Sequence, residues 1–283
     1  MGIIIAVILV IIAVCLIEVY YELHHFEVNT YQIPTSKVQN PLRYVVLSDL
    51  HNKQYGANNT LLLSEIEALN PDVVLLAGDM FTAHKDTCYQ DTISFLETLS
   101  NKFPTYLGYG NHETRIALYK EKFPDLHDAV FTSFSTSKIR VLSNQSESIE
   151  GTNITVNGLE IAHSFYGRMQ EKELPSGYIE KELGILDTSR FNILIAHNPI
   201  YFDAYIAYGA DLIVSGHVHG GIIKIPMLGG VISPSLKFFP HYDGGEFVKG
   251  NARMILSRGI GNHTIPLRFL NKAELIVLDI IPE

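Results

Sequence analysis

Polar residues of a narrow chemical range follow five of the apolar runs in this chain, at the points where strands would end. The five blocks are Ser48-Asp49-Leu50-His51, Gly78-Asp79, Gly110-Asn111-His112-Glu113, Ala196-His197-Asn198-Pro199 and Gly216-His217-Val218-His219-Gly220. In open α/β sheets, ligands bind at the carboxyl ends of the strands, so loops that are far apart in sequence reach one crevice. We therefore expect two aspartates, one asparagine and four or five histidines in one place.

This combination of side chains predicts a transition-metal site, because imidazole and carboxylate together suit Mn, Fe or Zn. The candidate ligands are Asp49, His51, Asp79, Asn111, His197, His217 and His219. Seven ligands exceed the need of one ion, whereas two divalent ions about 3.5 to 4 Å apart share a carboxylate. Asp79 is the natural bridge. Such a pair activates a bridging hydroxide and neutralises phosphoryl oxygens, so only the departing oxygen needs a proton, for which His112 is the candidate acid.

Each block taken alone also has a plainer interpretation. Asp49 and His51 are typical of a capping aspartate and a surface histidine, and Asp79 after a glycine is typical of a turn. Asn111 is typical of a turn as well, and His197 of a buried core histidine. The occurrence of all five blocks, in order and each at a strand end, favours the metal interpretation.

The blocks SDLH, GD, GNHE, AH and GHVH resemble the five-part signature of the calcineurin-like metallophosphoesterases. The tail SRGIGNHTIPLRFLNKAELIVLDI is similar to the membrane-associated bacterial branch called YaeI/YkuE-like. The resemblance implies that His112 is the catalytic histidine and that the fold is a four-layer αββα sandwich of two mixed β-sheets flanked by helices. It also implies one metal surrounded by Asp49, His51, Asp79 and His219, and a second surrounded by Asp79, Asn111, His197 and His217.

Two positions depart from the pattern of that branch. Ile222 stands where the branch commonly has Gln, and His263 stands where it has a small Ser. Neither residue replaces a ligand. Ile222 removes a polar group from the rim of the site, and we expect His263 at the surface or behind the ligands.

Apolar runs and helical stretches alternate along the chain in the pattern of an α/β fold. Strands are expected over 44–47, 73–77, 105–107, 153–156, 159–163, 191–196, 212–214 and 274–280, and helices over 59–69, 87–100 and 199–208. Near-continuous apolar strands between helices indicate sheets that are covered on both faces. The pattern therefore fits one catalytic domain built as two sheets with outer helices.

The N-terminal segment predicts a membrane anchor. Residues 1–17 carry no charged side chain, and the helix from Gly2 to Tyr21 would span about 30 Å, the thickness of a bilayer core. A buried core helix is the alternative, but the segment is apolar on every face. Without the marks of a cleaved signal peptide, we expect a transmembrane anchor over 1–22, an extended linker over 23–41 and a metallophosphoesterase domain over 42–283.

The expected location is the cell membrane, with a single N-terminal span. No Lys or Arg precedes the apolar segment, and the first basic residues after it, Lys37 and Arg43, are distant. The positive-inside rule therefore leaves the side of the membrane open, and an extracytoplasmic catalytic domain is the working expectation.

Composition limits the remaining classes of function. The 283 residues are 47% hydrophobic and 18% charged, enough to bury a large core. A net charge of −9 without a Lys/Arg stripe argues against nucleic-acid binding. The two cysteines, Cys15 in the apolar segment and Cys88, provide no disulfide framework, and Cys88 is expected as a small buried residue. The sequence leaves the oligomeric state open.

These observations lead to one main hypothesis and two alternatives. The main hypothesis is a metal-dependent hydrolase of phosphomonoesters or phosphodiesters at a membrane surface, acting through a dinuclear metal-bound hydroxide on a phosphorylated small molecule or lipid head group. The first alternative is a pyrophosphatase that acts on a nucleotide-sugar lipid. The second is a non-catalytic metal-binding module, against which the presence of His112 argues.

Overall fold

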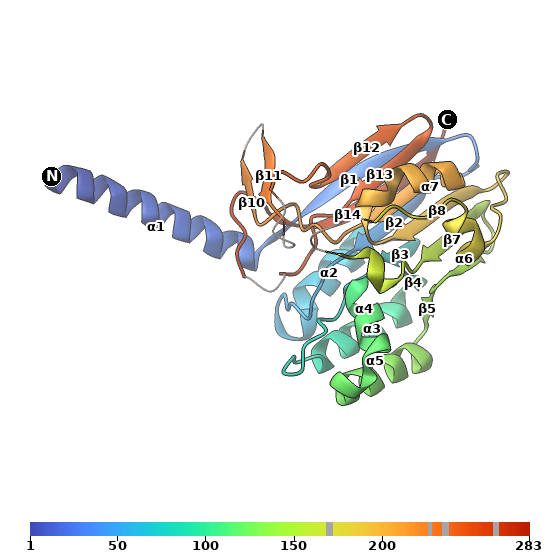
Figure 1. Cartoon of the computed structure of the whole chain (residues 1–283), viewed down its shortest axis with the longest axis horizontal. Helices are drawn as coiled ribbons and strands as arrows, with labels where there is room; N and C mark the ends of the chain where they lie inside the picture. Colours follow the sequence, from blue (N-terminus) through green and yellow to red (C-terminus); the bar gives the residue numbers. More distant parts are fainter. Residues whose placement is uncertain (168–171, 226–227, 234–237, 263–265) are drawn as a thin grey trace.

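The computed structural model describes residues 1–167, 172–225, 228–233, 238–262 and 266–283 (Figure 1). Helix α1 (Gly2–His24) extends away from the rest of the chain, which forms two large sheets with helices on their outer faces. The most apolar continuous stretch of 18 residues in α1 contains no buried residue, and the helix is long and apolar enough to cross a membrane.

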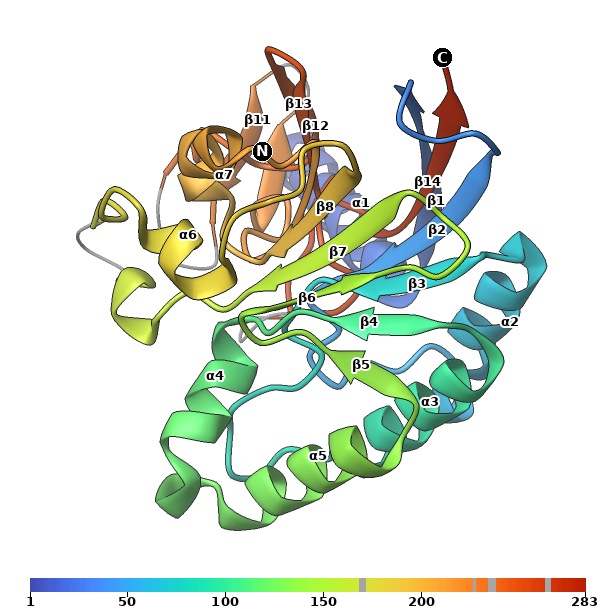
Figure 2. The same ribbon diagram turned by 90° about the vertical axis from the view of Figure 1, so that its right-hand side faces the viewer.

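The first sheet has the strand order β1-β14-β2-β3-β4-β5. Its strands are β1 (Phe26–Thr35), β2 (Leu42–Leu47), β3 (Val73–Leu76), β4 (Thr105–Leu107), β5 (Ile139–Val141) and β14 (Ala273–Pro282). β14 runs antiparallel to β2 and all other neighbours are parallel, so the sheet is mixed. The helices of this half are α2 (Thr60–Leu69), α3 (Gln90–Lys102), α4 (Asn111–Leu118) and α5 (Pro124–Thr136). Figure 2 shows α3, α4 and α5 below the sheet and α2 beside the end of β3.

The second sheet has the order β12-β13-β9-β8-β7-β6 and is also mixed, because its two edge strands are antiparallel to their neighbours. Its strands are β6 (Gln145–Ser148), β7 (Ile154–Leu159), β8 (Phe191–Ala196), β9 (Leu212–Ser215), β12 (Gly245–Lys249) and β13 (Ala252–Leu256). Helices α6 (Tyr178–Leu183) and α7 (Phe202–Tyr208) belong to this half. A separate small sheet consists of β10 (Ile223–Ile225) and β11 (Gly229–Ile232).

Three apolar clusters separate four layers. On β2, Val45 and Leu47 pack in the cluster under α2, α3 and α5, while Tyr44 and Val46 pack between the two sheets. Because successive side chains of a strand point to opposite faces, a continuously apolar run fills both clusters. On β8, Leu194 packs in the third cluster, under α6 and α7. The predicted αββα sandwich of two mixed sheets is therefore confirmed.

Several local features differ from the sequence-based expectations. Within the segment expected as a linker, residues 26–35 form β1, which pairs with β14 along ten residues. β1 places Phe26 and Val28 against one cluster and Ile33 in another, so the sheet begins before residue 42. The strand expected over 159–163 is also wrong, because β7 ends at Leu159 and a 3₁₀ turn begins at His163. Cys88, expected to be buried, is exposed.

Candidate metal centre

The carboxyl ends of strands from both sheets meet at one place. The N–H of Asp49, after β2, donates to the carbonyl of Gly78, after β3, at 2.9 Å. In the other sheet, the N–H of Gly216 donates to the carbonyl of His197 at 3.0 Å. His197 Nδ1 lies 2.7 Å from the carbonyl oxygen of Ala77, which joins the two sheets directly. Residues from distant blocks are thereby brought together, as the parallel strand order predicts.

The first group of ligand-type side chains consists of Asp49, His51 and His219. One ligand atom from each lies within 4.8 Å of the others, and all three residues are buried. His219 Nε2 is 3.1 Å from Asp49 Oδ1 and 3.1 Å from His51 Nε2. The two imidazole rings stack with their centroids 5.0 Å apart. Their nitrogens therefore face the same small volume beside the Asp49 carboxylate.

The second group consists of Asp79, His197 and His217, again with ligand atoms within 4.8 Å of one another. His197 Nε2 lies 3.1 Å from Asp79 Oδ2. The same carboxylate oxygen is 3.8 Å from His51 Nε2, so Asp79 lies between the two groups. The groups are also joined through Asp49, whose carboxylate accepts from the N–H of His217 at 3.1 Å.

The residues present fit divalent transition metals. Asn111 Oδ1 is buried and has no hydrogen-bond partner in the part of the chain that the structure describes. Leaving a buried acceptor without a partner is costly, and a cation at this point would remove the cost. Carboxylate, imidazole and amide oxygen together form a mixed N/O set of the kind that Mn, Fe and Zn prefer.

The electrostatics of the centre also favour bound positive charge. Burial lowers the pKa of His217 to about 3, which keeps its imidazole neutral and able to act as a ligand. Burial likewise lowers the pKa of His197, but the charges of Asp79 and Asp49 raise it more strongly, to about 10. Two fully buried carboxylates therefore attract a compensating positive charge, either a proton on His197 or a metal ion.

The backbone at the centre adopts conformations that most residues avoid. Five of the seven predicted ligands have positive φ: Asp49 at 55°, His51 at 49°, Asp79 at 58°, His217 at 75° and His219 at 52°. Such residues persist only where their surroundings hold them, and they gather at functional sites. Close approach also explains two glycines, because a Cβ at Gly110 would collide with Asp79 and one at Gly216 with Ser48 and Asp49.

His112 lies at the start of α4, beside the two groups. It also forms a third group with His51 and Asp79 whose ligand atoms lie within 4.8 Å of one another. The N–H of Ala83 donates to His112 Nδ1 at 2.8 Å, which makes Nδ1 an acceptor. In the neutral ring the proton therefore lies on Nε2.

Glu113 has a positioning role that sequence reasoning missed. Its Oε2 accepts from the N–H groups of Asp79 at 2.8 Å and Gly110 at 3.0 Å, and its Oε1 accepts from that of Phe81 at 3.1 Å. Burial and the charge of Asp79 raise its pKa to about 7, against the lowering effect of these three bonds. The available signal was an acidic residue in the first turn of a helix, the position of a capping box.

Asn271 supports the centre from a distant part of the sequence. Its Nδ2 donates to the carbonyls of His219, at 2.8 Å, and Gly221. Its own N–H donates to Glu22 Oε2 at 2.7 Å, so the His219 loop is connected through Asn271 to α1. No motif in the sequence marks this residue, because its role depends on tertiary contacts.

Two residues of the C-terminal tail remain, Arg258 and His263. Arg258 forms ion pairs with Glu27 on β1 at 2.6 Å and with Glu274 on β14 at 2.7 Å. Its guanidinium therefore has a structural role in joining these two strands. His263 lies outside the residues that the structure describes.

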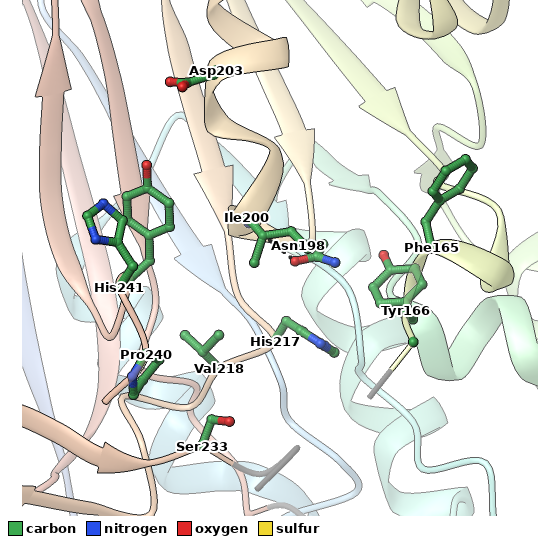
Figure 3. A pocket seen from close by; sticks show the side chains of 12 residues that line it. Phe165, Tyr166, Asn198, Ile200, Asp203, His217, Val218, Ser233, Pro240 and His241 are labelled. Carbon is green, nitrogen blue, oxygen red and sulfur yellow. Dashed lines mark hydrogen bonds between the residues drawn. The ribbon is translucent and has the colours of Figure 1, made fainter. Parts of the chain in front are cut away.

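A cavity of about 350 Å³ borders the second group at His217. Tyr166 faces His217 across its wall, with ring centroids 5.2 Å apart (Figure 3). The lining of the cavity is both aromatic and polar and includes Phe165, Tyr166, Asn198, Ser233, His241 and Tyr242. The centre is therefore open to a space that is large enough for part of a small molecule.

Comparison with known proteins agrees with this geometry. The family model described as Calcineurin-like phosphoesterase matches residues 42–221. The chain is similar to Uncharacterized metallophosphoesterase YkuE of Bacillus subtilis, with 27% identity over 91% of this chain and 86% of that protein. It is also similar to Phosphodiesterase YaeI of Escherichia coli, with 22% identity over 85% of this chain and 83% of that protein.

Two further similarities are weaker or cover less of the relative. Transmembrane protein with metallophosphoesterase domain, from Danio rerio, is 26% identical over 86% of this chain and 55% of that protein. Among solved structures, TT1561 of Thermus thermophilus is 14% identical with a TM-score of 0.44, covering 78% of this chain and 89% of that one. The match over residues 42–221 spans more than half of the chain, and the similarity to YkuE and YaeI confirms the predicted bacterial branch. The chain therefore belongs to the calcineurin-like phosphoesterase family and is a metal-dependent phosphoesterase.

Proposed function

We propose that the centre binds two divalent transition-metal ions, Mn, Fe or Zn, and that the chain hydrolyses phosphomonoesters or phosphodiesters at a membrane surface. The observation that carries this proposal is the pair of Asp/His groups joined at Asp79, together with the buried, unpartnered Oδ1 of Asn111, the residue before His112. One ion would be held by Asp49, His51, Asp79 and His219, and the other by Asp79, Asn111, His197 and His217.

When bound, the two ions would supply charge neutralisation for phosphoryl oxygens and acidification of water. The carboxylates of Asp49 and Asp79 would attract and retain the positively charged ions. Glu113 fixes the loop that carries Asp79. His112 presents its Nε2–H, and we assign it a hydrogen bond to the departing oxygen that stabilises the negative charge developing there.

The cavity beside His217 is the candidate position for the departing part of the substrate. Its aromatic side chains, Phe165, Tyr166 and Tyr242, suit an apolar or planar group, while Asn198 and Ser233 offer polar contacts. This lining is compatible with a small ester and with the head group of a lipid, and the activity test below distinguishes them.

The membrane location in the proposal rests on α1. Residues 1–22 would form the transmembrane anchor, and the connection that follows contains β1, already part of the catalytic sheet. The relative from Danio rerio is named as a transmembrane protein, which supports an anchored arrangement. An anchored domain stays within reach of lipid head groups, so a phosphorylated lipid is the substrate class that we favour.

The activity test uses the full chain reconstituted in liposomes and loaded in turn with Mn, Fe or Zn. Aryl phosphomonoesters, aryl phosphodiesters, phospholipid extracts and pyrophosphate-linked nucleotide lipids are supplied separately, and hydrolysis is measured from the released product. We expect metal-dependent hydrolysis that is lost in Asp79→Asn and kept in Asp125→Asn, a control at an exposed aspartate on α5. Metal-loaded protein that hydrolyses none of these esters would contradict the proposal.

A further inference from the structure

Large exposed apolar side chains outside α1 gather on one small part of the described chain. Most others, such as Leu118 and Ile185, stand alone on separate elements, as is common on protein surfaces. Five lie on β10, on the connection to β11 or on the segments beside them: Ile225, 40% exposed, Leu228, 68%, Phe238, 71%, Phe239, 61%, and Leu270, 42%. We call these five residues the apolar patch. Clustering of this kind marks an interaction surface.

Backbone contacts hold the segments of the apolar patch side by side. β10 pairs with β11 from Ile223 to Ile225. On one side, Ile223 bridges to Phe269, the residue before Leu270. On the other side, Ile232 of β11 bridges to Phe238, and the N–H of Phe239 donates to the carbonyl of Val231 at 2.9 Å. The five residues of the apolar patch therefore lie on adjoining segments of the chain.

This surface is fixed to the end of α1. Asn271, next to Leu270, donates its N–H to Glu22 Oε2 at 2.7 Å, and Glu22 is buried. Lys53 Nζ donates to the carbonyl of Leu23 at 2.7 Å, a second bond to the last turn of the helix. Figure 1 shows β10 and β11 on the side of the domain from which α1 extends. The domain is thus held in one orientation relative to α1, with the apolar patch beside the helix.

We propose that the apolar patch inserts into the interfacial zone of the same bilayer that α1 spans, which rests on the proposed anchoring of α1. Phenylalanine and leucine side chains beside a membrane helix bury apolar surface when they enter this zone, and aromatic residues are enriched there. A lipid surface explains why the five residues of the apolar patch gather next to the helix end, whereas the other exposed apolar residues outside α1 stand alone. The chain would then contact the bilayer at two fixed points.

Insertion would also bring the cavity to the membrane. Phe238 and Phe239 lead directly into Pro240 and His241, which line the cavity that borders His217. The mouth of the cavity would lie near the level of the lipid head groups. A phosphorylated lipid could then reach the metal centre without leaving the bilayer.

The chain contains no tryptophan, so a single introduced tryptophan reports its own environment. Full-length Phe238→Trp and Leu228→Trp are placed in phosphatidylcholine liposomes with or without lipids brominated at shallow acyl positions. Ile185→Trp, at a 94% exposed position between α6 and β8, is the matched control, and Leu9→Trp reports on α1. For an inserted patch we expect blue-shifted emission reduced by about half by brominated lipid in both patch variants, and no change in Ile185→Trp.

Each other result decides against the inference. If Leu9→Trp is quenched while both patch variants behave like Ile185→Trp, the anchor stands and the patch does not insert. A blue shift without quenching by bromine shows that another protein surface covers the patch. If Leu9→Trp is itself not quenched, the anchor and the patch fail together, while hydrolysis measured on the same samples tests the metal-dependent activity separately.

Discussion

Asp49, His51 and His219 form the half of the metal centre that is connected to α1, and we call it the anchor-side half. Asp79, His197 and His217 form the cavity-side half, which borders the cavity. The cavity-side half is held from within the core, by Glu113 and by the bond of His197 to Ala77. The His219 loop of the anchor-side half instead depends on Asn271, which also contacts the helix. Similar ligands are thus supported by different residues in the two halves. Substitution of a supporting residue should therefore change the metal affinity of one half more than that of the other.

The largest effect is expected from Asp79→Asn, because Asp79 lies between both halves. Removing its charge should lower the bound metal from about two ions per chain to one or fewer and reduce turnover by roughly four decades or more. Metal content by mass spectrometry and initial rates measure the two effects. Retention of two ions at the parent affinity would show that Asp79 is not shared.

A smaller loss is expected from His112→Asn, which removes the proposed hydrogen-bond donor to the departing oxygen from beside both halves. Turnover should fall by about two to four decades while metal content stays near about two ions per chain. His127→Asn, on α5, is the matched control and should keep the parent rate. Unchanged turnover in His112→Asn would exclude its assigned role.

Glu113→Gln tests the support of the cavity-side half. The amide group of glutamine would face backbone N–H donors, leaving at least one unsatisfied and lowering the free energy of unfolding by about 1 to 3 kcal/mol. The loops that carry Asp79 and Asn111 would shift, so affinity for the cavity-side ion, which both residues are proposed to hold, should fall by about ten- to a hundredfold. Thermal unfolding and metal titration check this, with Glu121→Gln as the exposed control. Retention of the parent affinity for the cavity-side ion in Glu113→Gln would contradict the assignment.

Asn271→Ala tests the support of the anchor-side half. It removes the side-chain bonds to the carbonyls of His219 and Gly221 and leaves the backbone bond to Glu22 in place. Affinity for the ion on that side should fall by about tenfold, and the other ion should be unaffected. Metal titration resolves the two steps, with Asn251→Ala as control. Loss of affinity for the cavity-side ion rather than the anchor-side ion would contradict the assignment of Asn271 to the anchor-side half.

The smallest effect concerns the pH dependence of stability near the anchor-side half. Burial raises the pKa of Glu27, but hydrogen bonds from Arg258 and Asn29 lower it more, so the net pKa is below its ordinary value. A carboxyl with a lowered folded-state pKa stabilises the fold above its unfolded pKa and loses that contribution as pH falls through the folded one.

Glu27→Gln should therefore be less stable than the parent near pH 7, by about 1 kcal/mol or less because the pair is partly exposed. The difference should disappear below about pH 4. Thermal unfolding of both proteins across this pH range measures it. A difference that grows as the pH falls would contradict the stabilising role of the ionised Glu27.

Most of the fold and the positions of the candidate ligands could be predicted from the sequence. The apolar runs around Val45 and Leu194 mark strands buried on both faces, and parallel strands place the residues that follow them at one edge. β1 was not predicted, because its apolar residues alternate with polar ones and include Pro34. α4 and α5 were not predicted either, although Glu113 in the first turn of α4 and Pro124 at the start of α5 are signals for a helix start.

The supports of the centre could not be predicted in the same way. Asn271 acts on His219 from 52 positions away, through contacts that exist only in the folded chain. Glu113 was visible within its block, but its three backbone partners come from two separate loops. Tyr166 reaches His217 from a segment without regular structure. Ligand types follow from local patterns, whereas the groups that hold them depend on tertiary packing.

The central claim is that two ions occupy the two halves and share Asp79. Crystals of the manganese-loaded full-length protein, measured for anomalous scattering, test it most directly. We predict two peaks about 3.5 to 4 Å apart, one on each side of the Asp79 carboxylate. One peak, or peaks away from Asp79, would contradict the account.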